Sequence, residues 1–79
     1  MFTREISLTT FDRIKNFARA VCSFESDIDI YKDNPNEAYD AKSLLGILAI
    51  DLSSPVHISI NTDNADELTK FNKEMDNFI

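Results

Sequence analysis

The segment DAKSLLGILAID, residues 40–51, joins a polar lead-in to an unbroken run of apolar or small residues. Ser43 stands directly ahead of that run, where its hydroxyl can accept hydrogen bonds from free backbone N–H groups two or three residues later. We therefore expect a helix that begins at Ser43 and ends near Ile50. Gly46 lies in its middle at a cost of about 1 kcal/mol against alanine, which indicates either a close approach of the sheet or of a partner, or simple tolerance.

The predicted helix is apolar on nearly every side and too short to cross a bilayer. One part of it should therefore be buried, and another part should stay exposed as a docking patch for a partner. The candidate residues of this exposed patch are Leu44, Leu45 and Leu48.

Three other segments alternate between apolar and polar residues, which is the pattern of a half-buried strand. They are residues 2–9, 27–31 and 56–61. Arg4 breaks the alternation of the first segment and places its start near a sheet edge. The turn-forming residues 33–36 precede residues 37–41, so we expect a short fourth strand there that returns antiparallel as a hairpin.

Two further segments carry apolar residues at the three- and four-residue spacing of an amphipathic helix. One follows Thr9 or Thr10 as its N-cap, and its polar face holds three of the chain's eight basic residues, either as a solvated surface or as a site for an acidic partner. The other follows a cap at Asp63 or Asn64. Their apolar stripes are Phe11, Ile14, Phe17, Ala18, Val21 and Phe24 in the first, and Leu68, Phe71, Met75 and Phe78 in the second.

The predicted order of elements is β-α-β-β-α-β-α. Each predicted strand is apolar on one face only, so one face of the sheet needs cover, and three helices can supply it. The pattern predicts an open-faced sandwich of the α+β class, in which three helices lie on one face of a four-stranded sheet.

The length and the net charge of the chain limit the classes of protein to which it can belong. Seventy-nine residues predict a single domain over residues 1–79. The net charge of −6, from 14 acidic and 8 basic residues, argues against binding to nucleic acids or to anionic membranes. No basic and apolar leader is present, and the lone Cys22, a packing or boundary residue, has no partner for an internal disulfide, so we predict a cytoplasmic location. The spacing of acids and His57 predicts no metal site and no cofactor.

The segment from Asp40 to Leu48, Asp-Ala-Lys-Ser-Leu-Leu-Gly-Ile-Leu, resembles the second-helix motif of HPr, the small phosphocarrier of the bacterial phosphoenolpyruvate-dependent sugar phosphotransferase system. The order of elements resembles this family over nearly the whole chain. The resemblance implies an HPr-like domain with a mostly antiparallel sheet, which is not an enzyme. It also implies that the first two helices form the docking surface for partner proteins, with these candidate contacts: Lys42, Leu44, Leu45 and Leu48.

Proteins of this family carry phosphate on a histidine in a Gly-x-His-Ala-Arg-Pro motif just before the first helix. Matching the apolar positions of the first helix places Thr10 at the histidine position and Asp12 at the arginine position, with Arg13 one place away. A threonine hydroxyl without a base is a poor phosphoryl acceptor, and Asp12 would repel an incoming phosphate. We therefore predict that the chain does not carry phosphate on histidine.

Ser43 matches the family's second modification point, a serine that a dedicated protein kinase phosphorylates in Gram-positive bacteria. A phosphate there would meet free N–H groups and the positive end of the helix dipole, and would add about −1.5 to −2 charge. Two interpretations stay open: Ser43 is only an N-cap, worth roughly 1 kcal/mol, or it is also a regulatory phosphorylation site. The second implies as partners a serine kinase/phosphorylase and a sugar-responsive transcription regulator of carbon catabolite repression, or transport components.

Two alternative functions also stay open. One is a phosphocarrier that uses Thr10 or His57, the only histidine, which the alternation places on the face of its strand that points away from the core. The other is a structural domain without either phosphorylation role, which forms a homodimer through its exposed edge strands.

Overall fold

The computed structural model describes residues 2–79 and has the predicted order of elements. The helices and strands follow one another along the chain with two short 3-10 turns, Pro35–Glu37 before β3 and Asp76–Phe78 at the C-terminal end. Their bounds are β1 (Phe2–Ile6), α1 (Phe11–Val21), β2 (Asp27–Tyr31), β3 (Tyr39–Asp40), α2 (Leu44–Leu48), β4 (Val56–Asn61) and α3 (Ala65–Met75).

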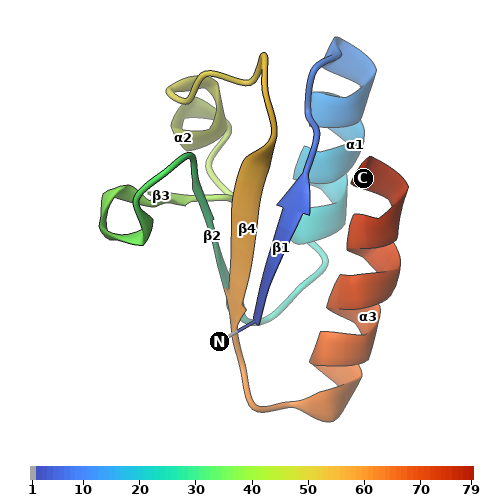
Figure 1. Ribbon diagram of the computed structural model, residues 1–79. Coiled ribbons are helices and arrows are strands. Elements are labelled where there is room, and N and C mark those ends of the chain that lie inside the picture. Colours follow the sequence, from blue (N-terminus) through green and yellow to red (C-terminus); the bar gives the residue numbers. More distant parts are fainter. Residues whose placement is uncertain (1) are drawn as a thin grey trace.

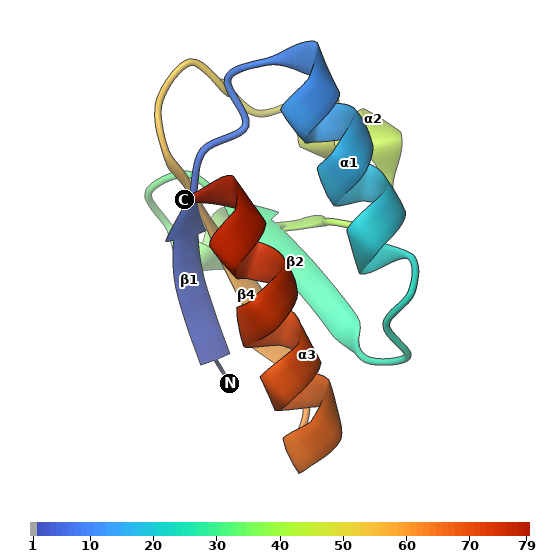
Figure 2. The ribbon, with the colours of Figure 1, turned by 90° about the vertical axis from the view of Figure 1, so that its right-hand side faces the viewer.

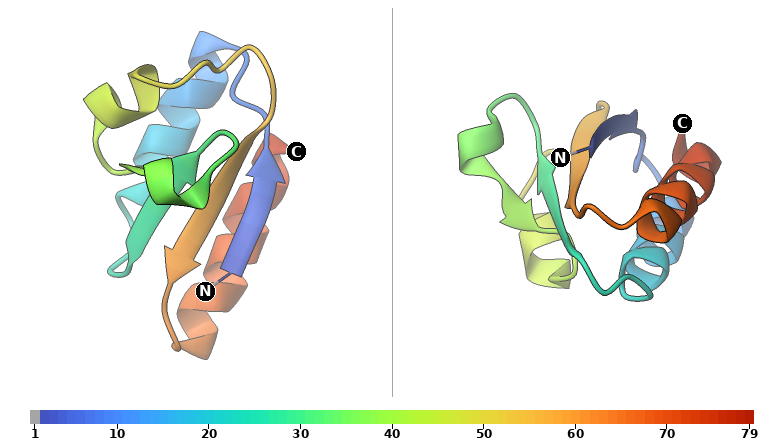
Figure 3. Two further views of the ribbon diagram at one scale, coloured as in Figure 1. Left: turned by 60° about the vertical axis from the view of Figure 1, so that its left-hand side comes forward. Right: turned by 90° about the horizontal axis from the view of Figure 1, so that it is seen from below.

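The four strands form one sheet in the order β1-β4-β2-β3, and all three pairs of neighbours are antiparallel. Figure 1 shows β4 in the middle of the sheet, between β1 and β2. The view from below in Figure 3 shows all three helices on the same side of the sheet, and Figure 2 shows α1 and α3 in front of it. The predicted open-faced α+β sandwich is therefore confirmed.

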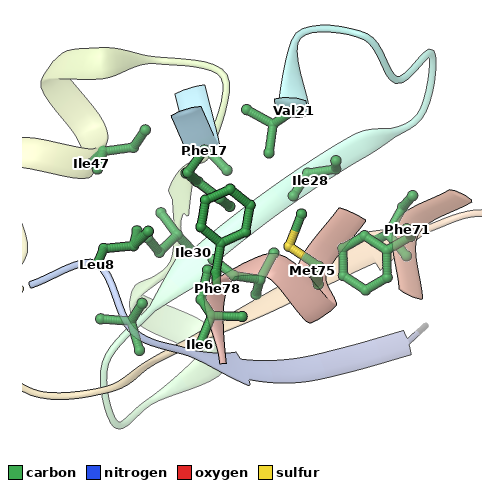
Figure 4. Close-up of a cluster of buried hydrophobic side chains, with 14 of the residues drawn as sticks. Ile6, Leu8, Phe17, Val21, Ile28, Ile30, Ile47, Phe71, Met75 and Phe78 are labelled. Atoms are coloured by element: carbon green, nitrogen blue, oxygen red, sulfur yellow. The ribbon is translucent and has the colours of Figure 1, made fainter. Parts of the chain in front are cut away.

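The core lies between the sheet and the helices. Val56, Ile58 and Ile60 of β4 have no exposed surface, as their alternation predicts. Figure 4 shows side chains from the strands and from α1 and α3 converging on this layer. Two aromatic pairs meet edge to face, Phe17 with Phe78 at 5.7 Å between ring centroids and Phe24 with Phe71 at 6.2 Å. Both arrangements are the favourable geometry for aromatic rings.

Two strands are shorter than their alternation predicts. β1 ends at Ile6 because the N–H of the next residue, Ser7, donates to the carbonyl of Phe78 at 2.7 Å instead of to the sheet. The predicted strand at residues 37–41 is reduced to Tyr39–Asp40, because the 3-10 turn capped by the Asn34 side chain takes up residue 37.

The predicted helix over residues 43–50 is also shorter, since α2 covers only Leu44–Leu48. Its last turn tightens: the N–H of Ile50 donates to the carbonyl three residues back, at 3.2 Å, in the 3-10 pattern. Gly46 allows α2 to approach β3 closely, because a Cβ there would lie 3.1 Å from the carbonyl oxygen of Asp40 and 3.3 Å from the Cβ of Tyr39. Of the explanations for a glycine in this helix, the structure therefore supports close contact between α2 and the sheet.

The interpretation of the first helix as a continuous apolar stripe is wrong at both ends. Phe11 is 77% exposed, because the first turn of α1 begins beyond the end of β1 and has no strand beneath it (Figure 1). Phe24 is buried, but α1 ends at Val21 and Phe24 reaches the core from the following loop.

Arg4, which breaks the alternation of β1, lies on a strand at the edge of the sheet and donates to Asp76 at 2.7 Å.

The loop after α1 is held by α3. The carboxylate oxygen Oε1 of Glu67 accepts hydrogen bonds from the backbone N–H of Glu25, the backbone N–H of Ser26 and the Ser26 hydroxyl, each at 3.1 Å. Desolvation alone would raise the pKa of Glu67, but the hydrogen bonds from Ser26 and Glu25 outweigh it and hold the pKa below its usual value. The charged carboxylate therefore stabilises the folded chain.

This linkage predicts how Glu67→Gln changes stability with pH. Glu67 contributes stability above its pKa in the unfolded chain, about 4.3, and this contribution is lost as the pH falls through the lower pKa of the folded chain. Glu67→Gln should lower Tm at pH 7, and the difference from the unaltered chain should shrink as the pH falls below about 4. Glu74→Gln on the same helix is the control and should leave Tm nearly unchanged. A decrease in Tm caused by Glu67→Gln that is equal at pH 7 and pH 3 would contradict the account.

Candidate functional site

The start of α1 is a capped helix end. The Thr10 hydroxyl accepts a hydrogen bond from the backbone N–H of Arg13 at 3.2 Å, so Thr10 is the N-cap. The guanidinium of Arg13 donates to the carbonyl of Ser7 at 3.0 Å and is half-buried. Asp12 is exposed in the first turn, where the helix dipole favours a carboxylate. These three residues therefore stabilise the beginning of the helix, and the only positive side chain among them is bound to the residue that follows β1.

Phe11 also lies at this end of α1, and its spacing places it on the predicted apolar stripe of the helix. Its spacing from Ile14 and Phe17 is the same as that of true core residues, so the sequence contains no signal that separates it from them. The structure leaves it 77% exposed. It is therefore an apolar surface residue directly beside Thr10.

The start of α2 has the predicted cap. The Ser43 hydroxyl accepts a hydrogen bond from the backbone N–H of Gly46 at 3.3 Å, and the Ser43 carbonyl accepts from the N–H of Ile47 at 3.0 Å. Ile47 is the buried residue of this helix. Ser43 itself is exposed. The hydroxyl thus lies at the surface, on a helix anchored to the core by a single isoleucine.

Three leucines form the exposed side of α2. Leu45 is 82% exposed, Leu48 is 55% exposed and Leu44 is 53% exposed. Exposure of leucine side chains to water is unfavourable, and the free energy falls when a partner covers them. The structure therefore brings Ser43 and these three residues, which we call the α2 leucines, together on one short helix.

Lys42 is turned toward the protein. Its ammonium donates to the carbonyl of Phe24 at 2.8 Å, and its side chain is half-buried. Its backbone N–H donates to the carboxylate of Asp40 at 2.9 Å. Lys42 therefore ties the beginning of α2 to the loop after α1. The charged group that binds the backbone just before α2 is the carboxylate of Asp40.

His57 lies in β4 on the face of the sheet that points away from the helices, as the alternation predicts. It pairs with Glu5 on one side and Tyr31 on the other, and its ring stacks on that of Tyr31 with centroids 5.1 Å apart. Asp29 lies on the same face; burial raises its pKa, and the neighbouring Asp27 and Asp40 add to the rise. This open face is therefore acidic.

Among residues 2–79, no group of three or more ligating side chains is placed to hold a metal ion. Nor does this part of the chain contain a helix that is both long and apolar enough to cross a membrane.

The antiparallel sheet with three helices on one face defines the class of small open-faced α+β domains. The family model described as the PTS HPr component phosphorylation site matches residues 13–78. The chain therefore belongs to the HPr family of phosphocarriers of the phosphotransferase system. The matched range begins at Arg13, so Thr10 and Asp12 lie outside it.

Among the solved structures that resemble this one are two HPr proteins. HPr-C-His from Thermoanaerobacter tengcongensis has a TM-score of 0.78 and 25% sequence identity, with 99% of this chain and 91% of the other covered. The phosphocarrier protein HPr from Bacillus anthracis str. Ames has a TM-score of 0.70 and 22% identity, with 99% and 96% covered, and supports the fold alone. No curated protein sequence matches the chain.

The cap geometry predicts how substitutions of Ser43 change stability. Ser43→Ala removes the acceptor for the N–H of Gly46 and should lower the free energy of unfolding by about 1 kcal/mol in urea denaturation. Ser43→Asp supplies another good cap and should stay within about 0.5 kcal/mol of the unaltered chain. Equal stability of the alanine and aspartate variants would show that the hydroxyl does not cap α2.

Proposed function

We propose that this chain is a regulatory protein-binding module of the HPr family, which is switched by phosphorylation of Ser43 and does not carry phosphate on histidine. The observation that carries the proposal is the exposed Ser43 hydroxyl at the start of a helix whose outer side consists of the α2 leucines. A protein kinase needs an accessible hydroxyl, and a protein partner needs an apolar surface beside it.

The chemistry at the start of α1 supports the second half of the proposal. Phosphate transfer needs a nucleophile that is activated by a base or is itself an ionisable ring. It also needs positive charge to stabilise the transferred group. Thr10 offers a hydroxyl that caps the helix, Asp12 brings negative charge, and Arg13 is bound to the carbonyl of Ser7. His57, the only histidine of the chain, is stacked on Tyr31 on the opposite face of the sheet from the helices.

Phosphorylation of Ser43 would act mainly through charge. The cap already accepts from the N–H of Gly46, so a phosphate would meet donors that are in place, and the helix would not need to refold. The net charge of the chain would change from −6 to roughly −8. The ammonium of Lys42 is bound to the carbonyl of Phe24, so neutralising charge would come from the partner.

The partners of such a module are proteins. A serine kinase/phosphorylase would set the state of Ser43, and a transcription regulator or a transport component would read it through the α2 leucines. A reader that prefers the phosphorylated form needs a basic residue near its apolar contact surface, because a doubly charged phosphate pairs best with arginine or lysine.

Mass spectrometry after incubation with a bacterial HPr serine kinase and ATP tests the proposal. We expect one phosphoryl group on the unaltered chain and none on Ser43→Ala. Ser53→Ala, which removes another exposed serine on the loop after α2, is the control and should be phosphorylated like the unaltered chain.

Two results would contradict the proposed switch. One is a chain that stays unmodified while a Gram-positive HPr in the same reaction is phosphorylated. The other is a phosphoryl group that persists in the Ser43→Ala variant.

A further inference from the structure

A hollow of about 550 Å³ lies between the 3-10 turn Pro35–Glu37 and the residues that follow α2. Figure 3, left, shows these two segments on the same side of the molecule, with α2 above the turn. It is lined by residues that follow β2, by residues of the turn and of β3, and by the segment after α2. The hollow therefore adjoins the C-terminal end of the helix that carries the α2 leucines.

The charged groups of this hollow are mostly acidic. Asp33, Glu37 and Asp51 line it, against one cation, Lys32. The ammonium of Lys32 donates to the carbonyls of Asp51 and Ser54 and to the Ser54 hydroxyl, which uses all three of its hydrogens. Lys32 is thus bound to the loop after α2, and three acidic side chains against one basic side chain leave the lining of the hollow net negative.

Two of these carboxylates have no partner within the described chain. Among residues 2–79, neither Asp33 nor Glu37 forms an ion pair, and neither side chain accepts a hydrogen bond. Asp51 accepts two hydrogen bonds from Ser53, from its hydroxyl at 2.6 Å and from its N–H at 3.0 Å, both on Oδ1. These bonds hold the pKa of Asp51 below its usual value, so it stays charged at neutral pH.

The remaining wall is apolar. Tyr39 is 45% exposed, and Ala49 and Ile50 lie across from the turn. A cation that enters would therefore meet carboxylates together with an aromatic ring and aliphatic groups. Such surroundings suit a cation carried on an aliphatic stem.

We propose that this hollow receives an arginine side chain of the partner protein that docks on the α2 leucines. A guanidinium presents five N–H donors in a plane, so it can pair with separate carboxylates and stack on Tyr39, whereas an ammonium is a single point of charge. The carboxylates do not form a cluster that could hold a metal ion, which favours an extended organic cation. The identity of the partner rests on the proposed function, but the chemistry of the hollow does not.

The hollow can be tested without a partner by titrating the ¹⁵N-labelled chain with N-acetyl-arginine amide and following the backbone amide signals. We expect saturable shifts centred on residues 37–39 and 49–51, with a dissociation constant on the order of 1 mM for so small a probe. N-acetyl-citrulline amide has the same shape without the charge, and should bind about tenfold more weakly or not at all.

Substitutions locate the binding. The double variant Asp33→Asn, Glu37→Gln should weaken N-acetyl-arginine amide about tenfold. Glu5→Gln, which removes an exposed acid on the open face of the sheet, should leave binding unchanged. Shifts that do not saturate, that citrulline reproduces, or that survive in a folded double variant would overturn the proposal.

The outcome is separable from that of the proposed function. Failure of the kinase reaction at Ser43 would remove the phosphorylation switch and leave the arginine titration as it stands. Absence of arginine binding, with normal phosphorylation of Ser43, would remove the hollow as a contact and leave the switch.

Discussion

The burial of one face of β4 is the constraint on which the rest of the molecule depends. Val56, Ile58 and Ile60 have no exposed surface, and this strand pairs with β1 on one side and β2 on the other. A shift of either neighbour by one residue would turn its own apolar side chains to the open face. The observed pairs, Ile6 with Val56 and Ile30 with Ile58, keep the apolar residues of three strands in one layer.

The helices lie where they cover the buried apolar layer of the sheet. Those positions in turn decide which helical residues remain exposed. α1 and α3 cover the sheet, and the buried Ile47 anchors α2 beside β3, where Gly46 permits close contact with the backbone of Asp40. A helix held by one buried residue leaves most of its side chains outside. The exposed α2 leucines and the exposed Ser43 are therefore consequences of a short helix on a short strand.

The two helix starts are similar in geometry and different in chemistry. Thr10 and Ser43 both cap a helix with a hydroxyl that accepts a hydrogen bond from an N–H three residues later. Beside Thr10, the arginine is bound to a carbonyl and the free charge is the acidic Asp12. Beside Ser43 lies an apolar surface, and beyond it the acidic hollow that ends near Asp51. Protein recognition is thus better supported at α2 than phosphate chemistry is at α1.

Features determined by neighbouring residues could be predicted from the sequence. The cap at Ser43, a cap at Thr10 or its neighbour, and the alternation of β4 all depend on residues a few places apart, and all are present. Features that depend on distant contacts could not be predicted. Phe11 has core spacing but no strand beneath it, and the hollow exists only because residues 33–39 fold back toward residues 49–51.

The central claim, that the histidine function at the start of α1 is absent, is tested most directly by phosphoryl transfer. The chain is incubated with enzyme I of the phosphotransferase system and labelled phosphoenolpyruvate, beside a histidine-bearing HPr as a positive control. The account predicts label on the control and none on this chain. Label on this chain that is lost in Thr10→Ala or in His57→Ala would contradict it.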